Sequence, residues 1–164
     1  MSSVARSHEW LEPGQLAESA RSLSGQQYLE AWANGELAPP MASTLAFRLT
    51  DFGEGFVEIS CTPDGFHYNP YGTAHGGLAA TLLDSATGCA VQSQLPAGVG
   101  YATLNLAVSY LRPLTARTGE VRCVGRVVSI GRTVAVSEAT LLDPSDKALA
   151  RATATCLIIN PESR

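Results

Sequence analysis

The fold is decided by residues 69–86, which read Asn69-Pro-Tyr-Gly-Thr-Ala-His75-Gly76-Gly77-Leu-Ala-Ala-Thr-Leu-Leu-Asp84-Ser-Ala. A polar loop here runs into a segment, 76–94, that lacks proline and is rich in Ala and Leu, so it propagates well as a helix. Gly76 and Gly77 are poor interior residues and belong at the helix start. There the first backbone N–H groups have no intrahelical partner. The stretch therefore predicts a helix over about 76–94 whose start suits an oxyanion or a polarised carbonyl.

His75 and Asp84 cannot act on one small group within a single chain. They are nine positions apart, which on a helix is about 13 Å of rise and close to half a turn. If both serve the same substrate, a second copy of the helix must run antiparallel to the first, so that Asp84 of one chain meets the helix start of the other. A two-fold dimer supplies this arrangement.

Asp84 is unusual because it interrupts an otherwise apolar helix, where an unpaired charge is costly. This position favours a functional acid over a structural ion pair. The residues on the same helix face are small, which leaves room for a ligand or for close helix packing: Gly77, Ala80, Thr81, Thr87 and Gly88.

Composition indicates one globular domain without nucleic-acid or membrane partners. The chain has 164 residues, 45% of them hydrophobic, and a net charge of −4. It contains no Lys/Arg run and no apolar run near the ~18 residues needed to cross a bilayer. The first 100 residues hold three basic and ten acidic side chains, the remainder eight and five. The basic second part could attract a small anion or simply form solvated strand faces.

The four cysteines are scattered without a C-x-x-C pair, so they are expected to be buried, reduced thiols in a cytoplasmic protein. His67, His75, Cys61 and Cys89 do not have metal-ligand spacing, and no metal site is predicted.

The order of elements predicts an α+β fold. We expect a flexible extension over 1–22, one domain over 23–160 and a short tail over 161–164. The domain begins with an amphipathic helix at about 24–34, ended by Gly35. Around the long helix the β-like runs are 43–50, 55–62, 101–111, 120–130, 132–142 and 148–159, with a connector at 51–54. One long helix against a large, curved antiparallel sheet is the expected architecture.

With these elements in place, the sequence resembles the hotdog-fold acyl-CoA thioesterases of the PaaI-type group. The resemblance runs from Ser24 to Ile159 and is carried by His75-Gly76-Gly77 with an acid nine residues later. It implies a curved sheet wrapped around the helix, and a homodimer with shared active sites that can assemble into a tetramer. It also implies hydrolysis of an acyl-CoA thioester to free coenzyme A and a carboxylic acid. Coenzyme A enters as part of the substrate, and no separate cofactor is implied.

The resemblance also assigns roles to individual residues. Asn69 and the N–H of Gly76 would bind the thioester carbonyl, with His75 beside them and Gly77 among the substrate-binding residues. Asp84 of the partner chain would act as base or nucleophile. The hydroxyl of Thr103 would position the attacking water, and Arg112 and Arg132 are candidate phosphate partners.

Other interpretations stay open at this point. His75 could act only as a cap, and Asn69 before Pro70 only as a turn residue. The domain could bind acyl-CoA without turnover, or act as an enoyl- or hydroxyacyl-CoA hydratase. A serine hydrolase of the α/β type is disfavoured, because the sequence has no G-x-S-x-G motif.

Overall fold

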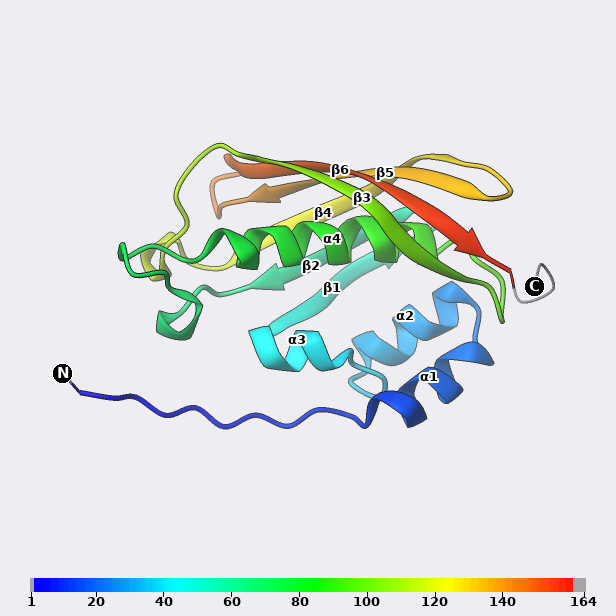
Figure 1. Ribbon diagram of the computed structural model, residues 1–164, viewed down its shortest axis with the longest axis horizontal. Coiled ribbons are helices and arrows are strands. Elements are labelled where there is room, and N and C mark those ends of the chain that lie inside the picture. Colours follow the sequence, from blue (N-terminus) through cyan, green and yellow to red (C-terminus); the bar gives the residue numbers. More distant parts are fainter. Residues whose placement is uncertain (1, 161–164) are drawn as a thin grey trace.

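A computed structural model describes residues 2–160, in which one antiparallel sheet curves around a central helix (Figure 1). The helices are α1 (Pro13–Arg21), α2 (Gly25–Ala33), α3 (Pro40–Leu45) and α4 (Gly76–Gln92), with short 3₁₀ turns η1 (Gly65–His67) and η2 (Ala116–Thr118). The strands are β1 (Phe47–Gly53), β2 (Phe56–Cys61), β3 (Gly100–Tyr110), β4 (Val121–Ile130), β5 (Val134–Leu142) and β6 (Ala148–Ile159). The predicted α+β hotdog architecture is confirmed.

The six strands form one sheet in the order β1-β2-β4-β5-β6-β3, and every neighbouring pair is antiparallel. Strand β3 therefore lies at one edge, bonded to β6 on one side only. A long, open strand edge is a template for pairing with another chain. This edge matters for the site described below.

Helix α4 lies along the concave face of the sheet (Figure 1). Its sheet-facing residues are buried: Leu78, Ala79, Leu82, Leu83, Ala86, Thr87, Gly88, Cys89, Ala90 and Val91. Gly125 on β4 permits the close approach, because a Cβ there would be 2.2 Å from the carbonyl oxygen of Ala86. The opposite face of α4, which carries Asp84, is left half-buried rather than sealed by the sheet.

Helix α2 fixes the N-terminal segment against the C-terminal end of α4. Its start has a capping box, in which Ser24 and Gln27 each satisfy the other's backbone N–H. A Cβ on Gly25 would be 1.6 Å from the carbonyl oxygen of Gln92, so the two backbones touch. Leu29 and Trp32 are buried in the main core. The helix expected at 24–34 is thus present at nearly the same bounds.

Two helices fall where the sequence analysis placed none. Pro13 and Pro40 each stand in the first turn of a helix, where the missing N–H of proline costs nothing. Helix α1 lies within the extension expected over 1–22. Helix α3 replaces the first residues of the strand expected at 43–50, which begins only at Phe47.

Two details of the strands differ from expectation. The β1–β2 turn lies at Glu54-Gly55 rather than at 51–54, because Gly55 provides a positive φ of 70°. In β3 the register shifts between Thr103 and Asn105, which interrupts the regular alternation of the two faces, and Leu104 is 61% exposed.

Within residues 2–160, no helix has both the length and the apolar character required to cross a membrane. The tail expected at 161–164 lies outside the described residues.

Candidate active site

His75 caps the start of α4. Its backbone is extended (φ −61°, ψ 138°), and its Nδ1 accepts a hydrogen bond of 2.8 Å from the Gly77 N–H. The glycine is required for this geometry, because a Cβ on Gly77 would lie 2.9 Å from that same Nδ1. His75 therefore acts as a cap of the helix start, and its ring accepts the hydrogen bond that the Gly77 N–H could otherwise donate to a ligand. The side chain itself remains exposed, beside the cavity described below.

Asn69 closes the loop that leads into α4. Its Oδ1 accepts hydrogen bonds from the N–H groups of Tyr71 (2.9 Å) and Thr73 (3.4 Å), and its Nδ2 donates to Thr73 Oγ1 (2.9 Å). This is the turn role that Asn often has. One hydrogen of the amide remains for a ligand, since an amide nitrogen carries two.

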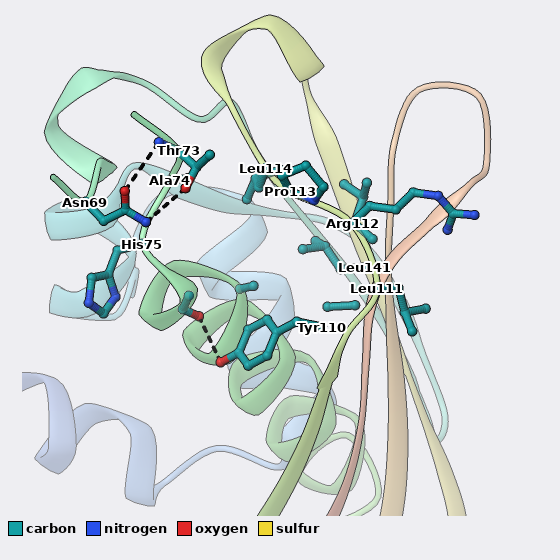
Figure 2. Close-up of a pocket in the computed structure, with 14 residues that line it drawn as sticks. Asn69, Thr73, Ala74, His75, Tyr110, Leu111, Arg112, Pro113, Leu114 and Leu141 are labelled. Atoms are coloured by element: carbon teal, nitrogen blue, oxygen red, sulfur yellow. Dashed lines mark hydrogen bonds between the residues drawn. The ribbon is translucent and has the colours of Figure 1, made fainter. Parts of the chain in front are cut away.

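The first residue of α4, Gly76, presents an unused donor. Its carbonyl accepts a hydrogen bond of 3.2 Å from the Tyr110 hydroxyl (Figure 2). Among the described residues, none accepts a hydrogen bond from its N–H. A Cβ at Gly76 would meet the Tyr110 ring only at 3.4 Å, so space remains at this donor.

These groups border an open cavity of about 400 Å³. Asn69, His75 and Gly76 form one side, and the end of β3 with the following segment forms the other, through Tyr110 and Arg112 (Figure 2). The Arg112 guanidinium is directed away from Asn69 and His75 and donates to the carbonyl of Ala148. The cavity thus combines a helix-start N–H, an amide and a nearby cation.

Asp84 lies further along α4 and pairs with strand β3. The Thr103 hydroxyl donates to Asp84 Oδ1 at 3.0 Å. Both residues are half-buried. The structure therefore brings together the two residues that only the family resemblance had linked.

Asp84 opens into a second cavity of about 350 Å³, separate from the first. Helices α1, α2 and α4 contribute most of its lining, together with Phe47 and Tyr101. Burial raises the pKa of both Tyr28 and Tyr101 well above the usual value, so these phenols stay neutral. Tyr28 and Trp32 belong to the amphipathic helix that the sequence predicts at about 24–34. Their place beside Asp84 follows from packing that the sequence does not show.

The predicted site residues consequently fall into two groups within one chain. Asn69, His75 and Gly76 surround one cavity, while Asp84 and Thr103 border the other. Eight residues of helix separate Gly76 from Asp84, or about 12 Å of rise. The turn that carries the exposed Arg132, between β4 and β5, lies at the opposite end of the sheet from the start of α4 (Figure 1).

Over the described part of the chain, no three His, Cys, Asp or Glu side chains are grouped so that they could hold a metal ion. The chemistry available here is that of hydrogen-bond donors and one carboxylate.

Comparison with known proteins gives one family. Residues 71–150 match the thioesterase superfamily model. A Halobacterium salinarum protein, provisionally named an esterase, is 49% identical over 84 residues, which cover 50% of this chain and 54% of that protein. This match thus spans about half the length of the archaeal relative.

Two solved structures extend the similarity over the domain. A phenylacetic acid degradation-related protein from Ralstonia eutropha JMP134 is 32% identical, with a TM-score of 0.72, over 79% of this chain and 98% of that one. The Streptococcus mutans UA159 protein smu.793, solved with acetyl CoA bound, is 30% identical, with a TM-score of 0.64, over 70% and 89% of the two chains. The chain therefore belongs to the thioesterase superfamily and has the hotdog fold of the PaaI-type proteins.

Proposed function

We propose that this protein hydrolyses acyl-CoA thioesters at a site shared between two chains. One observation carries the proposal: the N–H of Gly76, which no described residue accepts, and Asp84, which pairs with Thr103, lie on one helix, too far apart to act together within one chain.

The open edge of β3 supplies a way to unite them. Two β3 strands paired antiparallel about a two-fold axis would join two sheets and place two α4 helices antiparallel to each other. Asp84 of one protomer would then face the partner's Gly76 and Asn69. Each dimer would contain two equivalent sites, and tetramers would add no residue to either.

The chemistry fits these groups. The Gly76 N–H and the Asn69 amide would donate to the thioester oxygen, where negative charge develops as water adds to the carbonyl carbon. Asp84, oriented by Thr103, would accept the proton of that water as the new C–O bond forms. The C–S bond then breaks, the sulfur of coenzyme A takes up a proton, and a carboxylic acid remains. Direct attack by Asp84 would use the same geometry, with an anhydride hydrolysed in a second step.

Recognition of coenzyme A would use the first cavity and the nearby cations. Arg112 lines that cavity and is a candidate for a phosphate contact. In the proposed dimer, the sheet end that carries Arg132 lies alongside the partner's α4 start, so Arg132 is a second candidate. The acetyl CoA bound to the Streptococcus mutans protein supports this ligand class. No further cofactor is proposed.

A thiol-release assay with several acyl-CoAs tests the function directly. We expect wild-type protein to release coenzyme A and Asp84→Asn to lose most of this activity. Absence of thiol release from every acyl-CoA, or full activity in Asp84→Asn, would contradict the proposal. An increase in enoyl absorbance with a hydroxyacyl-CoA would indicate hydratase chemistry instead.

A further inference from the structure

We propose that the acyl group of the substrate occupies the cavity beside Asp84, and that helix α1 forms the wall that limits acyl size. This inference rests on the proposed function and extends it to a substrate class: thioesters with an apolar acyl group, aromatic or of medium length.

The lining of the cavity is the first argument. Its walls are mainly aromatic or apolar, with Tyr28, Trp32, Met41, Phe47 and Tyr101 among them. Among the residues that the structure describes, Asp84 is the one charged residue in this lining. A volume of about 350 Å³ is in the range of small-molecule sites, which are typically lined in this way. A charged acyl terminus would have no partner here, so an apolar group is favoured.

The place of Asp84 is the second argument. The carboxylate borders the cavity, so a carbonyl attacked beside Asp84 would have the cavity on the acyl side. The coenzyme A portion would then extend toward the helix start of the partner. One substrate could thus occupy both kinds of cavity, with the scissile bond between them.

Helix α1 closes the cavity as a surface element. Leu16 and Ala20, one turn apart, face the lining, while no residue of α1 is fully buried. The helix is attached at its two ends. Upstream, Arg6 donates to the carbonyls of Thr44 (2.6 Å) and Ser43 (3.2 Å) and lies 3.9 Å from the ring centre of Phe66. Downstream, the chain passes directly into the capped start of α2.

This wall should act as a size limit. Leu16 and Ala20 line the cavity but are not part of the main core. Changing either residue therefore alters the depth of the cavity and leaves Asp84, Thr103 and the core residues unchanged. The wall lies in residues 13–21, outside the segment 71–150 that matches the superfamily model.

The test uses full-length variants and stable CoA analogues in which a methylene replaces the thioester sulfur. Ala20→Phe should fill the cavity, Leu16→Ala should enlarge it, and Glu18→Phe on the exposed, opposite face of α1 is the matched control. Dissociation constants would be measured by calorimetry for acetyl, hexanoyl, decanoyl and phenylacetyl analogues. Because binding needs no turnover, the result stands even if the wild type releases no thiol, which would contradict only the proposed function.

We expect Ala20→Phe to weaken binding of the hexanoyl and phenylacetyl analogues by about 10- to 200-fold, while acetyl binding changes by less than about threefold. Leu16→Ala should shift preference toward the decanoyl analogue, and Glu18→Phe should reproduce the wild-type profile. Equal changes for every analogue, an unchanged profile in Ala20→Phe, the same shift in Glu18→Phe, or no binding of any analogue by the wild type would each overturn the inference.

Discussion

The Thr103 hydroxyl donates a 3.0 Å hydrogen bond to Asp84 Oδ1, joining the edge strand β3 to the half-buried face of α4. This contact orients one carboxylate oxygen and leaves the other for water. If Asp84 is the general base, Asp84→Asn should lower kcat by about 10²- to 10⁴-fold, the usual contribution of a positioned base. Steady-state thiol release would measure this, with circular dichroism as the folding control.

Thr103→Val should lower kcat less than Asp84→Asn does. Loss of a hydrogen bond to a charged group costs about 1.5–3 kcal/mol, roughly 10- to 100-fold in rate if the bond is needed in the transition state. Thr103→Ser keeps the hydroxyl and should recover most of the activity. A Thr103→Val enzyme as active as the wild type would show that the contact is only structural.

The Gly76 N–H can be removed without removing the helix. Gly76 is the first residue of α4, where proline is tolerated, and His75 has the extended backbone that the residue before a proline prefers. Gly76→Pro should lower kcat by about 10²- to 10³-fold, as loss of an oxyanion donor does. Gly76→Ala adds bulk but keeps the N–H, so comparing the two variants isolates the donor. Equal kcat in both would argue against an oxyanion role.

Asn69→Asp separates the turn role of Asn69 from a role in binding the carbonyl. Asp also forms such turns, so the bonds from Tyr71 and Thr73 N–H can persist and the melting temperature should change little. The amide donor is lost and a negative charge faces the developing oxyanion, so kcat should fall at least about tenfold. Unchanged kcat with unchanged stability would restrict Asn69 to the turn.

The cysteine thiols should be unreactive in the folded protein. Burial raises the pKa of Cys89 to about 12 and that of Cys61 to about 11, from 9.0. A disulfide reagent at neutral pH should therefore label the four thiols only after unfolding. Because the folded-state pKa values are raised, unfolded chains lose these protons first, and the free energy of unfolding should decrease as pH rises from about 9 to 12. Rapid labelling of native Cys89 would contradict this.

Pattern and propensity predicted the frame of the fold well. The strand expected at 148–159 coincides with β6 and the helix start expected at Gly76 with that of α4, because a clear turn precedes the strand and an Ala/Leu-rich segment follows the helix start. Helices α1 and α3 were not predicted, because a proline such as Pro13 or Pro40 can follow the end of one helix or stand in the first turn of another. Leu104 is exposed because a bulge shifts the alternation of inward and outward side chains along β3. No feature of the local sequence predicts this bulge.

Some features of the candidate site could likewise be predicted from the sequence, and others could not. Helix geometry alone predicted that His75 and Asp84 must lie apart within one chain, and they border different cavities. The partnership of Asp84 with Thr103 came only from the family resemblance, because two residues 19 positions apart meet through tertiary packing. The cavity under α1 was not predicted, since its lining comes from helices α1 to α4 and from two strands, whose mutual placement the sequence does not state.

The central claim is that each active site takes Asp84 from one chain and the Gly76 N–H from the other. Asp84→Asn and Gly76→Pro chains carrying different tags would be co-expressed, heterodimers isolated through both tags, and thiol release compared with each parent. The heterodimer would contain one site with both residues intact, so its activity should rise well above that of the two inactive parents. A purified heterodimer no more active than its parents would contradict the shared site.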